Sequence, residues 1–245
     1  MALLYVAAED FELKPFARAL TNARKLNWPV QYAMEGVLHG RRLVLVADGA
    51  GPKLAAHATA IAFRAFAGTG LTSSVIHTVI SVGFCGALDP NLGANEIVMG
   101  TEIVQSMKSE RFACTTGSAS QSYVSGPIFS QDRIANNAHE KHELRSLGTI
   151  AVEMEAAGVA AYAQKVGVPF ACIKVVSDRA DESFPFDLNR MRTNEGRIAR
   201  GKIGTYVLWH PILLPKLWGL KQRSDDAART LGDFLVSCTI SSEAG

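Results

Sequence analysis

The chain lacks the features that mark a nucleic-acid-binding or membrane-spanning protein. Its 245 residues carry a formal net charge of only +2, and lysine and arginine form no long tract. The charge balance therefore favours neither nucleic acid nor an anionic membrane as a partner. No apolar run reaches the roughly 18 to 20 residues that a bilayer-spanning helix needs. These absences indicate an ordinary soluble protein.

Cysteine is also scarce, and its spacing does not match that of a metal site. The chain contains no CxxC pair, because its cysteines are Cys85, Cys114, Cys172 and Cys238. This spacing argues against a zinc site and against a disulfide framework, and we expect core thiols in a reducing cytoplasm, with no metal or other cofactor. Residues 1–6 are too short for the apolar part of a secretory leader, so we expect a first strand there.

The composition and patterning indicate one α/β domain over residues 1–245. Hydrophobic residues make up 48% of the chain and charged residues 20%, enough for one sizeable core. No repeat or linker divides the sequence, and residues 108–122 read as a surface loop. Short apolar runs predict strands over 3–7, 30–35, 42–47, 75–82, 96–104, 123–129 and 170–176. Helices are predicted over 14–23, 54–67, 156–166 and 226–237, with a polar helix ending near 143.

One helix–strand unit stands out for its polar ends. Gly167 and Pro169 end the predicted helix, and the apolar run 170–176 that follows is typical of a parallel strand covered on both faces. Ser177 and Asp178 come directly after that strand. Because ligands in such sheets lie beyond the carboxyl ends of strands, these two residues are candidates for a functional site.

Carboxylates also precede this helix and follow the first strand. Glu153 and Glu155 would point roughly 200° apart if both were helical, so we expect only one of them to face a pocket. Glu12 follows the first strand together with Glu9 and Asp10. Acidic residues there either complement the dipole of the next helix or, for Glu12 in particular, serve a site at the strand's carboxyl end.

Small residues at two strand exits leave two interpretations open. Residues 49–51 and 83–88 are rich in glycine, which permits close backbone approach of a ligand or simply a tight turn. Phe129, at the end of another predicted strand, either stacks on a flat ligand or packs in the core.

The C-terminal part differs in character from the rest. An aromatic turn at 184–186 leads to a basic stretch over 190–202 and then to an apolar segment over 207–218, which two prolines interrupt. This segment either packs as a cap or subunit contact, or faces lipid or a greasy ligand, because a large exposed apolar patch needs a partner.

Taken together, these motifs resemble the nucleoside phosphorylase superfamily, and within it the 5'-methylthioadenosine/S-adenosylhomocysteine nucleosidases. The resemblance rests on residues 8–15, 49–53, 82–88, 125–129, 152–156 and 177–181. It implies a single domain with a central twisted mixed β-sheet surrounded by helices. It also implies cleavage of the bond between a purine base and ribose.

The resemblance also implies roles for individual residues. Asp178 matches the acid that protonates the purine at N7, which would require it to hold a proton near neutral pH, and Glu12 matches the base that activates water. Glu155 matches the carboxylate that grips the ribose hydroxyls. The remaining expected substrate-binding residues are Met154, Phe129, Phe84, Gly83, Ser177 and Phe186.

Departures from the family pattern bear on the nucleophile. Phe84 stands where the hydrolases carry a hydroxyl, and Lys174 where they carry arginine. The phosphorylases hold phosphate with an arginine and a serine at places that here are Ser81 and Phe84. Because Glu12 is present, we expect water as the nucleophile, with phosphate as a possible co-substrate in the alternative, phosphorolysis. A non-catalytic nucleoside-binding protein is a further alternative.

The tail points to the kind of substrate. Residues 195–197, 204, 210–211, 214–215 and 217 resemble the hopanoid-associated phosphorylase branch, which is connected with adenosylhopane. We therefore expect an adenosine derivative with a bulky or hydrophobic 5' group, releasing adenine. The resemblance further implies a homodimer that binds a small nucleoside. The cysteines favour a cytoplasmic location, and a peripheral lipid contact through residues 207–218 is the alternative that the apolar segment itself leaves open.

Overall fold

The computed structural model describes residues 2–67, 76–105, 110–184, 187–191, 193 and 214–240. The helices are α1 (Asp10–Ala17), α2 (Pro52–Ala67), α3 (Ala138–Arg145), α4 (Ala156–Val166) and α6 (Leu214–Ser237), with a short 3-10 helix, η1 (Leu188–Met191). The first six strands are β1 (Ala2–Ala7), β2 (Thr21–Lys25), β3 (Tyr32–Leu38), β4 (Arg41–Ala47), β5 (Ile76–Ala87) and β6 (Ile97–Gln105). The others are β7 (Arg111–Ala113), β8 (Gly117–Ser118), β9 (Val124–Ser130), β10 (Ala151–Glu153), β11 (Phe170–Asp178) and β12 (Thr239–Ile240).

The strands form one large mixed sheet in the order β10-β9-β6-β11-β5-β1-β4-β3-β2, with β7 paired to β6. The neighbours β11, β5, β1 and β4 run parallel, whereas β6 is antiparallel to β11 and β3 is antiparallel to β4. Since β10 pairs with both β9 and β5, the strands β5, β11, β6, β9 and β10 close into a ring. The short strands β8 and β12 pair separately.

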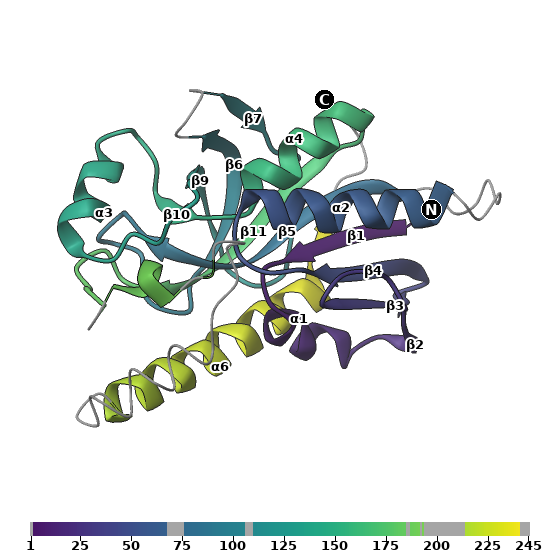
Figure 1. Cartoon of the computed structure of the whole chain (residues 1–245), viewed down its shortest axis with the longest axis horizontal. Coiled ribbons are helices and arrows are strands. Elements are labelled where there is room, and N and C mark those ends of the chain that lie inside the picture. The colour runs from purple at the N-terminus through teal and green to yellow at the C-terminus, as the bar shows by residue number, and fades with distance from the viewer. Residues whose placement is uncertain are drawn as a thin grey trace.

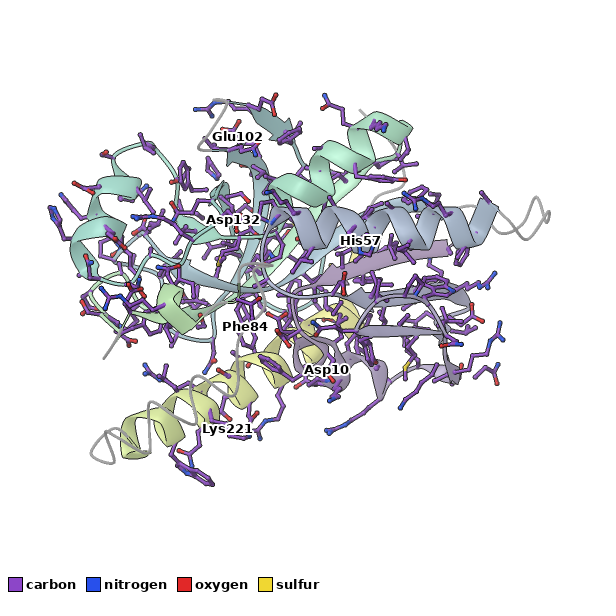
Figure 2. The ribbon with its side chains drawn as sticks, in the orientation of Figure 1. Asp10, His57, Phe84, Glu102, Asp132 and Lys221 are labelled. Atoms are coloured by element: carbon purple, nitrogen blue, oxygen red, sulfur yellow. The ribbon has the colours of Figure 1, made fainter. Side chains whose placement is uncertain are left out.

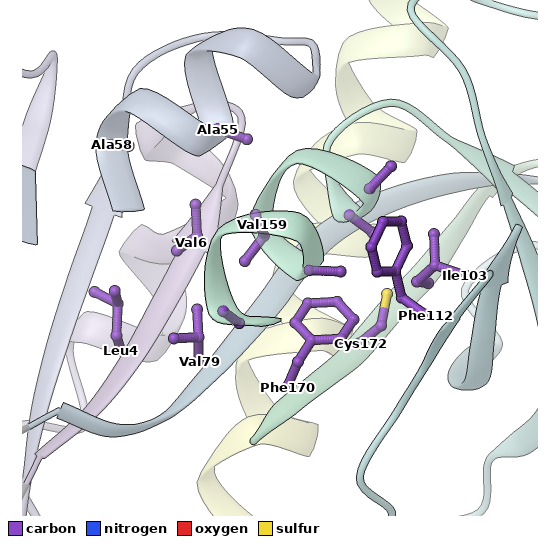
Figure 3. Close-up of a cluster of buried hydrophobic side chains, with 14 of the residues drawn as sticks. Leu4, Val6, Ala55, Ala58, Val79, Ile103, Phe112, Val159, Phe170 and Cys172 are labelled. Atoms are coloured by element: carbon purple, nitrogen blue, oxygen red, sulfur yellow. The ribbon is translucent and has the colours of Figure 1, made fainter. Parts of the chain in front are cut away.

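Helices cover both faces of the sheet. Figure 1 shows α2 and α4 side by side over one face, and α1 and α6 over the other, with one end of α6 extending beyond the sheet. Two buried clusters fill the two interfaces. Figure 3 shows the first, where Ala55 and Ala58 of α2 and Val159 of α4 lie over Val6 and Val79 of the strands.

Strand β1 illustrates why this part of the sequence forms a central strand. All six of its residues are buried, and it pairs with β4 on one side and β5 on the other. An uninterrupted apolar run is what a strand covered on both faces requires. The sheet and its covering helices confirm the predicted α/β fold, a central mixed sheet surrounded by helices.

Several predicted boundaries were wrong. The helix predicted over 14–23 begins at Asp10 and ends at Ala17, and residues 21–25 form the edge strand β2. All residues of β2 are exposed, and its sequence, TNARK, lacks the alternation of apolar and polar residues that predicts a half-buried strand. The predicted surface loop over 108–122 contains β7 and β8. Strand β5 continues to Ala87, so the glycine-rich exit predicted at 83–88 lies mostly inside a strand.

The four cysteines are free, and those on β5 and β11, Cys85 and Cys172, are buried as expected. Within the described ranges, no helix combines the length and apolar character that crossing a bilayer requires.

Phe186, most of the basic stretch and residues 207–213 lie outside the described residues. Trp218, at the edge of the apolar segment, is 65% exposed on α6. The homodimer and the lipid contact stay predictions.

Candidate active site

A cavity of about 200 Å³ opens where β1, β5, β10 and β11 end. Most of the residues that line it are apolar or small, and three are the predicted carboxylates. The described lining consists of Ala8, Glu12, Phe84, Cys85, Gly86, Arg133, Ile134, Ala135, Val152, Glu153, Met154, Glu155, Ser177, Asp178, Phe184 and Leu188. The predicted carboxylates and part of the glycine-rich exit at 83–88 therefore meet at one place, whereas residues 49–51 and Phe129 are outside the lining.

Glu12 lies in the first turn of α1 with only 4% of its surface exposed. Its Oε2 accepts a hydrogen bond of 2.8 Å from the backbone N–H of Glu9, and its Oε1 accepts one of 3.1 Å from the N–H of Phe84. Gly83 has a φ of +126°, and a Cβ at this position would lie 2.8 Å from Oε1 of Glu12. Gly83 is outside the cavity lining, and its role in the fold is to make room for this carboxylate.

The surroundings of Glu12 favour its protonated form. Burial, and then the negative charge of Glu155, raise the pKa of Glu12 to about 7, although the two backbone N–H groups and Lys174 act in the opposite direction. A carboxyl group with a pKa near the working pH is suited to accept a proton in one step and release it in the next.

Glu153 and Glu155 both come before helix α4, which begins at Ala156 as predicted. Glu153 is the last residue of β10, and α4 begins at Ala156. The carboxylate of Glu153 accepts hydrogen bonds from the backbone N–H groups of Glu155 and Ala156, both at 2.9 Å, and so caps α4. Both glutamates are among the lining residues, but the side chain of Glu153 is fully buried against Lys174 whereas that of Glu155 is 7% exposed, which agrees with the expectation that only one of them faces the cavity.

Lys174 links these two glutamates from β11. It is fully buried, its Nζ lies 2.8 Å from Glu153 and 3.6 Å from Glu155, and it donates to the carbonyl oxygen of Val82 at 3.2 Å. Burial alone would lower the pKa of Lys174, but the two carboxylates more than offset this and raise it. The other oxygen of Glu155 accepts from the N–H of Gly51 at 3.1 Å, and burial raises the pKa of Glu155.

Asp178 ends β11 and is 7% exposed. Ser177 donates its hydroxyl to Oδ1 of Asp178 at 2.6 Å. A strand irregularity before Asp178 sets it opposite Gly86 of β5, where a Cβ would lie only 2.9 Å from its Oδ2. Gly83 and Gly86 therefore each leave space for one carboxylate, a use of the glycine-rich exit that the sequence did not reveal.

Lys141 is a residue of the site that sequence reasoning missed. Its Nζ lies 2.5 Å from Oδ2 of Asp178, and its side chain is 1% exposed. On sequence it is one lysine in a short polar helix, α3, 37 positions before Asp178. No local pattern could have indicated that pairing.

The predicted aromatic and thioether contacts divide into two groups. Phe84 and Met154 line the cavity. Phe84 lies beside the start of α1 (Figure 2), with its ring 5.7 Å from that of Phe11. Phe129 is 4% exposed and packs in a small cluster with Leu88, Ala135 and Val152, outside the cavity lining. Its stacking on a ligand stays a prediction.

Other lining residues came from segments that the sequence left without a role. Ile134, Phe184 and Leu188 add apolar surface. Arg133 is the one lysine or arginine in the described lining, and it pairs with Glu140 at 3.0 Å on the outside of the protein.

The arrangement can therefore move protons at two separate carboxylates and hold polar groups at a third. Glu12, Glu155 and Asp178 come from three different elements, and each is fixed by a different set of donors. Acid–base chemistry on an uncharged, partly apolar ligand fits such a cavity better than binding of a strongly anionic one.

Comparison with known proteins places this geometry in context. The model of the family described as the phosphorylase superfamily matches residues 3–123 and 119–203. A 5'-methylthioadenosine/S-adenosylhomocysteine nucleosidase of Baumannia cicadellinicola is 28% identical over 173 residues, which are 60% of this chain and 72% of that protein. An aminodeoxyfutalosine nucleosidase of Helicobacter pylori is 27% identical over 174 residues, with the same 60% and 72% coverage.

Solved structures share the fold. A 5'-methylthioadenosine/S-adenosylhomocysteine nucleosidase of Neisseria meningitidis, in complex with methylthio-immucillin-A, superposes with a TM-score of 0.70 at 22% identity, covering 96% of this chain and 97% of the other. Futalosine hydrolase of Helicobacter pylori gives a TM-score of 0.71 at 19% identity, covering 97% and 96%.

Proposed function

Because the chain belongs to the phosphorylase superfamily, whose members are purine nucleosidases and nucleoside phosphorylases, we propose that it hydrolyses the N-ribosyl bond of adenine nucleosides. Glu12 activates water, Asp178 delivers a proton to the base, and Glu155 holds the ribose. Three curated relatives are named as nucleosidases, which supports hydrolysis over transfer to phosphate.

The observation that carries the proposal is the position of the Glu12 carboxylate against Gly83 and Phe84 of β5. A phosphate nucleophile at this place would need free backbone N–H groups or a nearby cation. Here the N–H of Phe84 is already donated to Glu12, and Lys174 is held by Glu153 and Glu155. An anion beside ionised Glu12 would be repelled, whereas a water molecule there would find a base.

The carboxylates then divide the reaction between them. As the C1'–N9 bond breaks, its electron pair moves into the purine, and protonation at N7 through Asp178 makes the base a better leaving group. Positive charge develops on the ribose, and the carboxylate of Glu155 binds the adjacent hydroxyls. Water adds to C1' and gives its proton to Glu12, whose pKa of about 7 suits it to accept that proton.

The apolar side of the cavity bears on the substrate's 5' group. Phe84 and Phe11 form a partly exposed aromatic pair, and Ile134 and Leu188 also lie around the cavity. No polar side chain is present at position 84 to meet a charged substituent. We therefore extend the proposal to adenosine derivatives whose 5' substituent is apolar.

The experiment is a comparison of adenine release from 5'-methylthioadenosine, a 5'-alkylthioadenosine and S-adenosylhomocysteine. We expect release from the first two, with a higher kcat/KM for the longer apolar chain than for the zwitterionic homocysteine. Asp178→Asn and Glu12→Gln should each lower kcat by about 100-fold or more, because each removes one proton-transfer step. Asp132→Asn, a change outside the described cavity lining, is the matched control and should leave kcat unchanged.

Two results would contradict the proposal. Tight binding of these nucleosides without any adenine release would indicate a binding protein that has lost turnover. Release at an unchanged rate by Asp178→Asn would show that the base leaves without the assigned acid.

A further inference from the structure

Lys141 is a buried charged residue that contacts Asp178 and that the proposed mechanism leaves without a role. Its side chain is 1% exposed, and its Nζ meets three oxygen atoms: Oδ2 of Asp178 at 2.5 Å, the carbonyl of Arg179 at 2.5 Å and the carbonyl of Glu182 at 3.3 Å. An ammonium group has three hydrogens to donate, so all three are used. The centroid of the Phe184 ring lies 5.9 Å from the same nitrogen, and Phe184 also lines the cavity.

These three acceptors differ in one chemical respect. A carboxylate can take a proton, whereas a backbone carbonyl cannot at ordinary pH. If the proton directed at Asp178 moves onto the carboxylate, the resulting amine keeps two hydrogens for the two carbonyls and a lone pair for the new O–H. The hydrogen-bonding pattern is therefore complete both before and after the transfer.

The other charged groups around the pair have partners of their own. Glu153 and Glu155 face Lys174, Glu12 is held by backbone N–H groups, and Arg133 pairs with Glu140. The side chains of Arg179 and Glu182 point to other partners, Asp181 and Arg223 respectively. The thiol of Cys85, on β5, is buried, and burial raises its pKa, so it stays protonated. Lys141 is thus the ammonium group that Asp178 contacts within the described residues.

We propose that Lys141 is a positioning residue for leaving-group protonation, and that the Lys141–Asp178 pair, rather than the Asp178 carboxyl alone, stores the proton that the base receives. This inference rests on the proposed function and adds to it the source of the proton. As the glycosidic bond breaks, one proton moves from Nζ of Lys141 to Asp178 and one from Asp178 to the purine. The amine regains a proton from water after the base has left.

If the Lys141–Asp178 pair stores the proton, removing Lys141 should change how turnover depends on pH. With Lys141 present, the stored proton stays available as the pH rises, since an ammonium group holds it. With Lys141 replaced by methionine, which has a similar length and no charge, Asp178 must take its proton from solvent. That supply falls as the pH rises, because the concentration of protons in the solvent falls.

The test compares the unmodified chain with Lys141→Met over about pH 5.5 to about pH 8.5, on two substrates. On 5'-methylthioadenosine, we expect kcat/KM of Lys141→Met to fall by less than about 10-fold at the acid end and by about 100-fold or more at the alkaline end. On 4-nitrophenyl riboside, whose phenolate leaves without a proton, the two proteins should have parallel profiles.

Arg145→Met is the matched control. Arg145 lies on the same helix and pairs with Asp89 at 2.7 Å, away from the cavity, so the variant removes a basic residue and an ion pair from α3 without touching Asp178. Its pH profile should follow that of the unmodified chain. A loss in Lys141→Met that is constant across pH, or equal on both substrates, would show a purely structural role and overturn the inference.

A second comparison does not depend on Lys141→Met folding with an unpaired buried carboxylate. Asp178→Asn and the double variant Lys141→Met/Asp178→Asn both lack that charge. We expect equal rates of adenine release from the two, because Lys141 acts only through Asp178; a further fall in the double variant would overturn the inference. An unmodified chain that cleaves no nucleoside would overturn the proposed function as well, which distinguishes the two failures.

Discussion

Replacing Glu12 by glutamine should make the protein more stable at alkaline pH while it lowers kcat by about 100-fold or more. Glu12 is 4% exposed, and its pKa rises from 4.5 to about 7, chiefly because burial disfavours the charged form. Each pKa unit corresponds to about 1.4 kcal/mol, so ionised Glu12 lowers the free energy of unfolding by about 3 kcal/mol.

The sign follows from proton linkage. Between pH values of about 4.5 and about 7, the native state holds a proton on Glu12 that the unfolded chain has lost, so the free energy of unfolding falls as the pH rises. Glutamine cannot ionise, and the variant lacks this part of the decline. The amide also loses one of the two backbone hydrogen bonds of Glu12, about 1 kcal/mol, but that loss is the same at every pH.

The assay is urea unfolding at about pH 4.5 and about pH 8 for both proteins. The difference in unfolding free energy between Glu12→Gln and the unmodified chain should grow by about 3 kcal/mol in favour of the variant. Glu143→Gln, on an exposed face of α3, is the control and should show no such growth. A difference that changes by less than about 1 kcal/mol would refute the argument that ionised Glu12 is held in a destabilising environment.

Three further predictions concern neighbouring residues. The kcat/KM for adenine release should fall about tenfold per pH unit below a pH of about 7, because Glu12 must be ionised to accept a proton from water. A kcat/KM that stays constant down to about pH 5 would contradict the role of Glu12 as the base. Gly86→Ala should lower kcat/KM by about 10-fold or more with a small change in Tm, because the added Cβ would lie 2.9 Å from Oδ2 of Asp178. Gly93→Ala is the control: its added Cβ would lie 3.8 Å from the nearest atom, in Glu96, so kcat/KM should stay unchanged. Lys174→Met should lower the free energy of unfolding by about 3–5 kcal/mol, because it leaves the buried carboxylate of Glu153 without its cation. A loss of less than about 1 kcal/mol in urea unfolding would show that this ion pair does not hold the site together.

The sequence predicted the secondary structure correctly where the hydrophobic pattern was long and regular. Strand β1 and helix α2 follow directly from a buried apolar run and an alanine-rich amphipathic segment. The edge strand β2 could not be predicted, because its residues are all exposed and its stability comes from pairing with β3. Tertiary pairing of that kind leaves no local signal.

The site was predictable to the extent that it sits at strand ends. Glu12 comes shortly after β1, and Asp178 is the last residue of β11. The topology of a parallel sheet brings such positions together. Lys141 depends on how α3 docks against the loop after β11, and the geometry of that docking is not encoded in either segment alone. The roles of Gly83 and Gly86 likewise became visible only through the carboxylates beside them.

The most direct test of the central claim is the identity of the sugar product when adenine is released in the presence of phosphate. The account predicts that the sugar is released without a phosphate group, one per adenine, and that the rate does not depend on phosphate concentration. Formation of the 1-phosphate, detected by 31P NMR in step with adenine release, would contradict water activation at Glu12.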